Sequence, residues 1–218
     1  LRLIAELSNE ETMLQSFLKG EDIHKSTASK VFKVDLDNVS DEMRSNAKVV
    51  NFGIIYGVSA FGLSEQSTLN RKEASELIKV YFETYPNLKN YIDNQISFAQ
   101  KNGYVQTILG RKRYLRNINS RNSFIRGHDE RNAVNMPVQG SAADLIKLAM
   151  ISIDKAFSAN SLKSKMVLQV HDELVFDVHV SEKEIVKEMV KNTMEQIYTT
   201  KAPLKVDIGF GHNWLEAH

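Results

Sequence analysis

The sequence contains no cysteine, which excludes disulfide bonds and metal sites built from thiolates. This absence also fits a reducing compartment, so we expect the protein in the cytoplasm. Only three prolines and ten glycines interrupt 218 residues, which favours long helices. No apolar run approaches the length of a membrane span, and Leu1–Glu6 lacks the organisation of a signal peptide. Because the sequence starts at Leu1 without methionine, we expect it to be a piece of a longer protein.

Charge is distributed unevenly along the chain, although the formal net charge is only +1. Residues 1–43 hold nine acidic and five basic residues, whereas residues 111–131 hold seven basic and two acidic residues. A local excess of five positive charges suits a polyanionic partner. A solvated basic loop would have the same composition, so the cluster alone leaves both interpretations open.

Local signals predict a helical N-terminal half. Ser40 is placed to cap a helix over residues 43–56 that ends at Gly57. Two further helices are predicted over residues 71–85 and 88–101, because a proline follows the first and a glycine the second.

The middle of the chain is predicted to contain a short hairpin and then a helix. Residues 104–109 and 113–118 flank a glycine-containing basic turn, which is typical of a hairpin. Residues 141–157 predict a helix whose dense apolar positions, Ile151 among them, indicate burial.

Two β-like runs, over residues 166–170 and 174–180, are joined by His171-Asp172-Glu173. In the second run, strand periodicity places four apolar side chains on one face, those of Leu174, Phe176, Val178 and Val180.

Ser181 and Glu184 are spaced as a capping box for the next helix, and residues 204–210 alternate like a final strand. The predicted fold class is α+β, with a helical first half followed by a small antiparallel sheet backed by helices.

One stripe of the predicted helix over residues 43–56 runs from cations to aromatics. Arg44, Lys48, Phe52 and Tyr56 are spaced four apart, so their side chains lie within an arc of roughly 120°. The cations could neutralise phosphates and the aromatics could pack on a sugar and a base, in the order found in a nucleoside triphosphate. The alternative is an ordinary amphipathic helix, with the aromatics in a core and the cations extended into water.

Adjacent carboxylates at Asp172 and Glu173 stand at the junction of two runs that look buried. Carboxylates on a rigid support suit divalent cations, and two such ions can assist an in-line phosphoryl displacement. A solvated turn without function would have the same sequence, and a metal site would need a further carboxylate from elsewhere.

Two segments resemble the signatures of family A DNA polymerases of bacteria. The pattern R-x-x-x-K-x-x-x-F-G-x-x-Y-G at Arg44–Gly57 is similar to the fingers-helix signature, and V-H-D-E-L at Val170–Leu174 is similar to the palm signature. Supporting stretches occur at residues 22–24, 103–105, 110–113 and 135–144. The resemblance covers essentially the whole chain in order.

The resemblance implies a template-directed DNA polymerase that adds deoxynucleotides to a primer 3′ end with two Mg²⁺ ions. Its implied domains are the start of the palm at 1–7, the fingers at 8–126 and the palm at 127–218. The implied catalytic residues are Asp172, which would also ligate the metal, Glu173 and Lys48. The implied nucleotide contacts are His24, Arg44, Lys48, Phe52 and Tyr56. The implied DNA contacts are Arg131, Asn135, Gln139 and His171, together with the basic-turn residues Arg111, Lys112 and Arg113.

The start of the chain departs from the family pattern. The family's other palm signature, D-Y-S-Q-I-E-L-R, ends in the two residues with which this chain begins, Leu1-Arg2. Its metal-binding aspartate is therefore absent, and we expect this chain alone not to polymerise. The implied partners are primer–template DNA, dNTP and the upstream thumb and palm of the same polymerase, with no membrane.

Three other assignments fit parts of the sequence. A single-subunit RNA polymerase has related palm and fingers, and a non-catalytic DNA-binding fragment would also fit the basic stretch. An unrelated helical scaffold would require both signatures to arise by chance.

Overall fold

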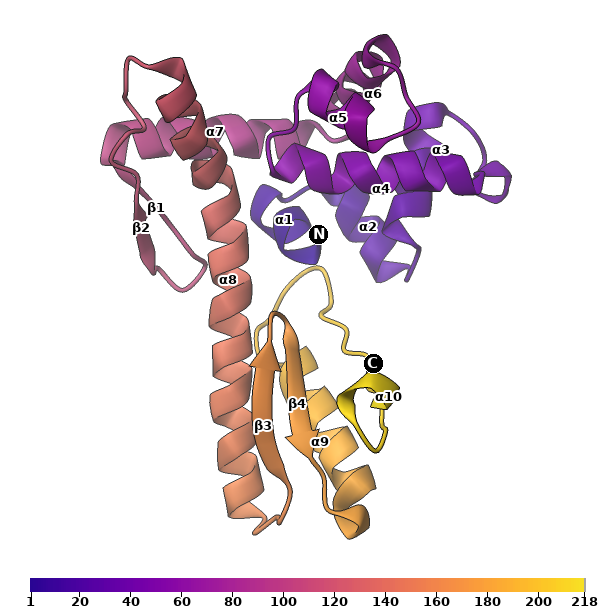
Figure 1. Ribbon diagram of the computed structural model, residues 1–218, viewed down its shortest axis with the longest axis vertical. Helices are drawn as coiled ribbons and strands as arrows, with labels where there is room; N and C mark the ends of the chain where they lie inside the picture. The colour runs from indigo at the N-terminus through magenta and orange to yellow at the C-terminus, as the bar shows by residue number, and fades with distance from the viewer. Residues whose placement is uncertain (218) are drawn as a thin grey trace. The chain divides into compact units, whose positions relative to one another are not determined.

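The computed structural model describes residues 1–217, which are mainly helical with two small antiparallel sheets (Figure 1). The first half contains helices and one 3-10 turn: α1 (Arg2–Ser8), α2 (Glu11–Leu18), α3 (Ile23–Phe32), η1 (Leu36–Asn38), α4 (Asp41–Ile55), α5 (Ala60–Gln66), α6 (Arg71–Thr84) and α7 (Pro86–Asn102). The second half comprises β1 (Tyr104–Gln106), β2 (Lys112–Tyr114), α8 (Ser123–Ala159), β3 (Lys165–Val170), β4 (Glu173–Asp177), η2 (Val180–Glu182), α9 (Lys183–Glu195) and α10 (Trp214–Ala217). The predicted α+β class is confirmed.

Residue contacts divide the chain into two compact units, Leu1–Ser141 and Ala142–His218. In the first unit, α3 packs against α4 and α6, and α7 packs against α1 and β1. Its largest fully buried side chains include Tyr81, Tyr85 and Met13. The predicted division into fingers and palm concerns function and stays a prediction.

Helix α4 forms much as its sequence predicts. Ser40 Oγ accepts a hydrogen bond from the backbone N–H of Met43 at 3.2 Å, and two acidic residues occupy the first turn. The helix ends before Gly57, which has a φ of 69°, a left-handed conformation that glycine adopts without steric cost. The N-terminal cap and the final glycine therefore set the length of the helix.

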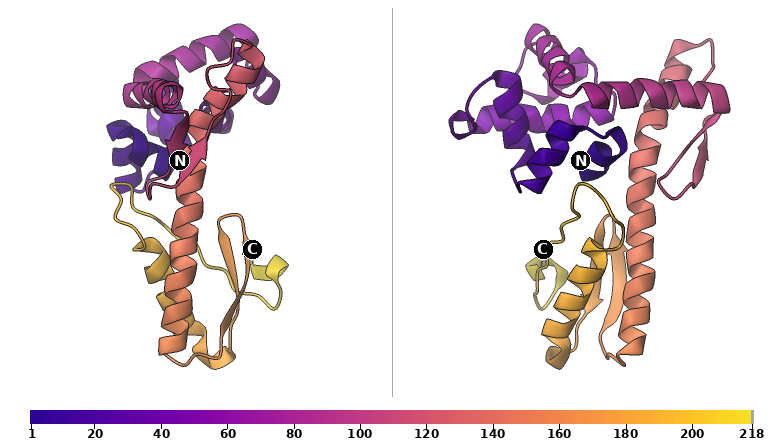
Figure 2. Two further views of the ribbon diagram at one scale, coloured as in Figure 1. Left: turned by 90° about the vertical axis from the view of Figure 1, so that its left-hand side faces the viewer. Right: turned by 180° about the vertical axis from the view of Figure 1, so that it is seen from behind.

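The predicted hairpin is present but shorter than expected. Strands β1 and β2 pair from Tyr104↔Tyr114 to Gln106↔Lys112, and the hairpin runs beside the first part of α8 (Figure 2). Val105 is fully buried in a cluster with residues of α7, the segment after β2, and α8: Ala99, Leu115, Ile118 and Ala133. This small core holds the hairpin against the helices of the first unit.

Helix α8 begins at Ser123, much earlier than the predicted start at residue 141. Pro137 lies inside the helix and is buried, although proline lacks the N–H that an interior position normally donates. Because the first half of α8 is polar and contains this proline, its sequence does not predict a helix. Ile151, predicted to be buried, is 53% exposed, whereas Ala149 and Ile153 on the same helix are buried.

In the second unit, β3 and β4 form an antiparallel hairpin with α9 and the end of α8 packed on it (Figures 1 and 2). One apolar core contacts the sheet. It contains Ala149, Ile153 and Phe157 of α8 and Val186 and Val190 of α9. The β4 residues Leu174 and Phe176 pack against this core, as does Val178 just beyond the strand. The predicted face of the second strand is thus confirmed for these three residues.

Three local predictions in this unit are wrong. Val180 is 91% exposed because β4 ends at Asp177 and the chain then turns into η2. The capping box is absent: Ser181 Oγ lies 2.9 Å from His179 Nδ1, and α9 has no side-chain cap. Residues 204–210 form no strand, because no neighbouring strand pairs with them within the described part of the chain.

Candidate active site

The stripe on α4 lies on the exposed face of that helix. Phe52 and Tyr56 are 41% and 53% exposed, and Arg44 and Lys48 are also exposed. The opposite face of the helix is buried and contains Asn46, Ala47, Val50, Asn51, Gly53, Ile54 and Ile55. The alternative in which the two aromatics fill a core is therefore wrong. Two large aromatic rings kept in contact with solvent are available to a flat ligand.

Arg44 is held at the cationic end of the stripe by Asp22. Its Nε donates to Asp22 Oδ2 at 2.9 Å, and its Nη2 lies 2.8 Å from the same oxygen. Asp22 Oδ1 also caps α3 by accepting the backbone N–H groups of His24 and Lys25. Burial alone would raise the pKa of Asp22, but these N–H groups and Arg44 outweigh it and hold that pKa below its ordinary value. A phosphate approaching Arg44 would meet a guanidinium already oriented by a carboxylate.

His24 follows that cap and joins the stripe from a second helix. Its ring centroid lies 5.6 Å from that of Phe52, and its Nδ1 lies 3.1 Å from Asn51 Nδ2. Burial lowers the pKa of His24, Asp22 raises it, and nearby cations including Arg44 and Lys48 lower it. The net direction is downward, so the ring is neutral at pH 7.

Residues of α8 meet the aromatic end of the stripe. Gln139 Nε2 donates to the Tyr56 hydroxyl at 3.4 Å. A Cβ added to Gly57 would lie 2.9 Å from Arg131 Cγ, so the arginine side chain packs directly over that glycine. The first unit therefore gathers five predicted site residues of α3 and α4 with two of α8.

Asn135, another predicted DNA contact on α8, is only 7% exposed. Its Oδ1 has no hydrogen-bond partner among the described residues. Direct contact with DNA would require this buried amide to become accessible.

The three cations of the β1–β2 hairpin are not equivalent. Arg111 Nη2 donates to the backbone carbonyl of Gly140 at 3.0 Å, which fastens the hairpin to α8. Lys112 Nζ lies 4.2 Å from the centroid of the Tyr104 ring. Arg113 is exposed, although it pairs in register with the fully buried Val105. The three cations therefore differ: Arg111 is bonded to α8, Lys112 lies over a tyrosine ring, and Arg113 is exposed.

The second unit carries the predicted carboxylates at the β3–β4 turn. His171 has a φ of 54° and, with Asp172, joins strands whose last pair is Val170↔Glu173. Positive φ is what tight two-residue hairpins require. Asp172 is exposed, whereas Glu173 is partly buried and its Oε1 accepts a hydrogen bond from Trp214 Nε1 at 2.6 Å. The two neighbouring acids therefore have different surroundings.

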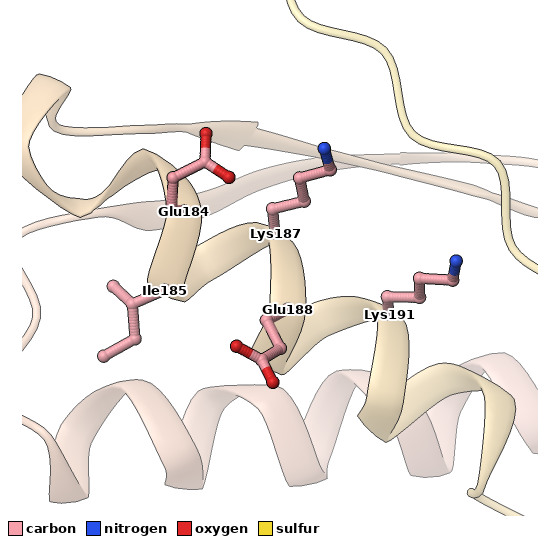
Figure 3. A pocket seen from close by; sticks show the side chains of 5 residues that line it. All are labelled: Glu184, Ile185, Lys187, Glu188 and Lys191. Carbon is pink, nitrogen blue, oxygen red and sulfur yellow. The ribbon is translucent and has the colours of Figure 1, made fainter.

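A shallow hollow also lies on α9, away from the predicted site residues. Figure 3 shows Lys187 and Lys191 pointing one way and Ile185 and Glu188 pointing the opposite way. With Glu184 these are its only lining residues, and none is a predicted site residue. A shallow surface lined by one charged helix lacks the apolar walls that hold a small ligand.

Residues 1–216 match the family described as DNA polymerase family A. The chain belongs to this family. It is 50% identical over 216 residues to DNA polymerase I of Caldicellulosiruptor bescii, covering 99% of this chain and 25% of that protein. It is 49% identical to DNA polymerase I of Streptococcus pneumoniae over 218 residues, again 25% of that protein. The chain thus spans about a quarter of the length of these curated relatives.

A solved structure supports the same assignment. The POL domain of Pol1 from M. smegmatis, in complex with DNA primer-template and dNTP, superposes with a TM-score of 0.94 at 39% identity. The match covers 99% of this chain and 38% of that one. An unrelated helical scaffold is excluded by these relationships.

Polymerases of this family use divalent metal ions. Asp172 suits such an ion because its carboxylate is exposed and a hard oxygen donor. No cluster of three histidine or acidic residues able to hold a metal occurs among residues 1–217. Within residues 1–217, Asp172 could therefore supply one ligand of a metal site, but the remaining ligands are not grouped with it.

Two contributors to the site carried no recognised signal in the sequence. Asp22 belongs to the matching stretch at residues 22–24, and an acid placed to cap the helix that follows is a detectable pattern. Asn51 stands beside Phe52 in the signature but points to the opposite, buried face. A polar residue at a core position of a helix is the signal that would have revealed it.

Proposed function

We propose that this chain is part of a template-directed DNA polymerase that adds deoxynucleotides to a primer 3′ end. The observation that carries the proposal is the exposed stripe of α4, whose cations and aromatics follow the order of phosphate, sugar and base. The chain is similar in sequence to DNA polymerases I and in structure to a polymerase domain in complex with primer-template and dNTP. These similarities support a DNA polymerase over an RNA polymerase.

In this proposal, the first unit binds the nucleotide. Arg44 offers a two-pronged guanidinium to phosphate oxygens, Lys48 a point charge and His24 a hydrogen bond. These groups stabilise the negative charge that builds up during phosphoryl transfer. Phe52 packs on the sugar, and Tyr56 lies beside the new base pair, where its bulk checks shape.

Primer–template DNA is assigned to Arg131, Asn135, Gln139 and His171, with Arg111, Lys112 and Arg113 of the hairpin as backbone contacts. Amide and guanidinium groups suit the minor groove, whose acceptor pattern is shared by all correct base pairs. Arg113 is the best placed of the hairpin cations, because Arg111 already binds the Gly140 carbonyl.

Two Mg²⁺ ions are the proposed cofactor, and they would supply charge neutralisation and activation of the attacking hydroxyl. Asp172 would contribute one carboxylate ligand, and the remaining ligands are assigned to other parts of the polymerase. Glu173 is held by Trp214 and would support the turn next to Asp172. The proposed location is the cytoplasm, where bacterial DNA and dNTPs are found.

The decisive experiment is primer extension by the polymerase that contains this chain. We expect Asp172→Asn to slow Mg²⁺-dependent incorporation by about a hundredfold or more, because charge stabilisation by a metal is worth several kcal/mol. Asp177→Asn is the matched control, since Asp177 is also exposed and lies at the far end of β4. Removal of divalent ions by EDTA should abolish incorporation by every variant.

Two results would contradict the proposal. One is equal activity of Asp172→Asn and Asp177→Asn. The other is salt-dependent DNA binding without any template-directed incorporation, which would favour a non-catalytic DNA-binding role.

A further inference from the structure

A buried polar cluster lies directly beneath the stripe of α4. Asn51 and Thr27 are both fully buried, and they connect α4 to α3. Asn51 Nδ2 lies 3.1 Å from Thr27 Oγ1 and 3.1 Å from His24 Nδ1. One buried amide thus touches the partly exposed ring of a predicted phosphate contact. Most buried amides are hydrogen-bonded, and the orientation of the Asn51 amide decides which partner faces its oxygen and which partners face its N–H groups.

Two tyrosines of the segment ending α6 complete the cluster from the other side. The Tyr81 hydroxyl donates to Asn51 Oδ1 at 3.0 Å, and the Tyr85 hydroxyl lies 2.9 Å from Thr27 Oγ1. Burial, with the nearby Tyr85 and Glu10, raises the pKa of Tyr81 well above its ordinary value. Tyr81 therefore keeps its proton, and this buried O–H needs an acceptor. Asn51 Oδ1 is that acceptor.

The orientation of the amide then decides which nitrogen of His24 carries the proton. With Oδ1 turned to Tyr81, the amide N–H groups of Asn51 point to Thr27 and His24. A neutral imidazole has one donor and one acceptor nitrogen, and an N–H facing Nδ1 requires Nδ1 to be the acceptor. The proton consequently resides on Nε2.

The surroundings of His24 agree with a neutral ring. The charged side chains that act on it are those of Asp22, Arg44 and Lys48. A second proton on Nδ1 would face the Asn51 N–H group directly, which would be repulsive.

We propose that Asn51 is a positioning residue, which holds His24 as the Nε2–H tautomer so that it offers a neutral hydrogen-bond donor to a phosphate oxygen of the nucleotide. The ligand part of this inference rests on the proposed function. The tautomer part rests only on contacts within the first unit. Arg44 and Lys48 supply positive charge at the stripe, whereas His24 supplies a directional hydrogen bond and no further charge.

The tautomer can be measured without nucleotide or DNA. In the protein labelled with ¹⁵N-histidine, long-range ¹H–¹⁵N spectra distinguish the two tautomers, and a His24→Gln variant assigns the signal. We expect wild-type His24 to be the Nε2–H form, with a pKa below that of an ordinary histidine. In Asn51→Asp, the new carboxylate should accept a proton from Nδ1, so both the tautomer and the pKa should change, the latter upward.

Asn46→Asp is the matched control. Asn46 is also buried on α4, but its side chain bonds Thr68 and does not touch His24. It should leave the His24 spectrum unchanged. Identical tautomer and titration of His24 in wild type and Asn51→Asp would overturn the proposal.

A second variant covers the case in which Asn51→Asp does not fold. Tyr81→Phe removes the O–H that orients the amide, so His24 should become a mixture of tautomers. Tyr91→Phe is its control, because Tyr91 is a buried tyrosine of α7 whose hydroxyl has no partner among the described residues. A single, unchanged tautomer in Tyr81→Phe would also count against the proposal.

Kinetics then test the ligand part in the polymerase that contains this chain. His24→Gln and Asn51→Leu should each weaken nucleotide use, as kcat/KM for dNTP, by about 5- to 10-fold, the size expected for one hydrogen bond. The double variant should be no worse than either single variant, because both remove the same interaction. Additive losses would mean that Asn51 acts independently of His24. If the wild-type polymerase incorporates no nucleotide, the proposed function is wrong. The tautomer of His24 is still tested independently by the ¹⁵N spectra.

Discussion

At the scale of single residues, Glu182 makes contacts with residues far from it in the sequence. Its carboxylate accepts the backbone N–H groups of Lys163 and Ser164 and the Ser164 hydroxyl, at distances from 2.7 to 3.0 Å. The sequence predicted a capping box one position away, because Ser181 and Glu184 have the correct spacing. Residue spacing predicts contacts only between neighbours along the chain. It does not predict that the N–H groups of Ser164 and Lys163, 18 and 19 residues earlier, bond to Glu182.

These contacts make Glu182 a source of acid sensitivity. The backbone N–H of Lys163 and the side chain of Ser164 lower the pKa of Glu182 to about 2 from an ordinary 4.5. A lowered pKa means that the carboxylate stabilises the fold fully above pH 4.5, and that this contribution is lost as the pH falls towards 2. Glu182→Gln should therefore lower the melting temperature at pH 6, and the difference from wild type should vanish near pH 2.

Thermal melting followed by circular dichroism at several pH values would test this prediction. Glu184→Gln serves as the control, since Glu184 is exposed on α9. A wild-type protein and a Glu182→Gln variant that differ equally at pH 6 and pH 2 would contradict it.

At the scale of secondary-structure elements, Glu10 joins the starts of two helices. Its Oε1 accepts the backbone N–H of Thr12 in α2, and its Oε2 accepts that of Asn87 in α7. Helix α7 has no side-chain cap of its own, because Tyr85 precedes it. A helix leaves its first N–H groups unsatisfied, and Glu10 provides the acceptor across 77 residues of sequence.

Glu10→Ala should therefore destabilise the fold by about 2–4 kcal/mol, since it leaves two N–H groups without acceptors in a site that is 2% exposed. Glu11→Ala, at the neighbouring exposed position, should change stability by less than about 0.5 kcal/mol. Urea denaturation of both variants gives the comparison. Similar midpoints for the two would show that Glu10 does not join the helices.

Elements with strong local signals were predictable from the sequence, and those set by partners were not. Helix α4 has a serine cap, acidic residues in its first turn and a final glycine, and it was predicted to within two residues at each end. The first half of α8 is polar and contains Pro137, so its helicity depends on packing against β1, α7 and the segment after β2. Residues 204–210 alternate like a strand, but alternation does not supply a neighbouring strand.

At the scale of the whole molecule, family membership rests on the entire chain and not on a single motif. The sequence identified which residues belong to the stripe and the β3–β4 turn, because both are signatures. It did not reveal the buried amide of Asn51, because the hydrogen bonds that Asn51 makes to other helices leave no periodic pattern. No helix within residues 1–217 is long and apolar enough to cross a membrane.

The uneven charge leads to a prediction about DNA affinity. If the proposed function is correct, the longer protein that contains this chain should bind primer–template DNA with a strong dependence on salt, because each cation at a phosphate releases a counterion. Arg113→Ala should reduce the slope of log affinity against log salt concentration by about one. Lys72→Ala, an exposed cation on α6, should leave the slope unchanged. Fluorescence anisotropy across a salt series measures both, and equal slopes for the two variants would remove Arg113 from the DNA contacts.

Gly57 is a position at which this chain can vary little. Its backbone has a φ of 69°, and a Cβ there would lie 2.9 Å from the Arg131 side chain, so conformation and space independently disfavour any side chain. A smaller side chain at position 131 would make room for a Cβ at position 57, but the positive φ would still disfavour it. Substitution of Gly57 is therefore disfavoured even with a compensating change at Arg131, and random mutagenesis of this loop should recover fewer tolerated substitutions at position 57 than at its other positions.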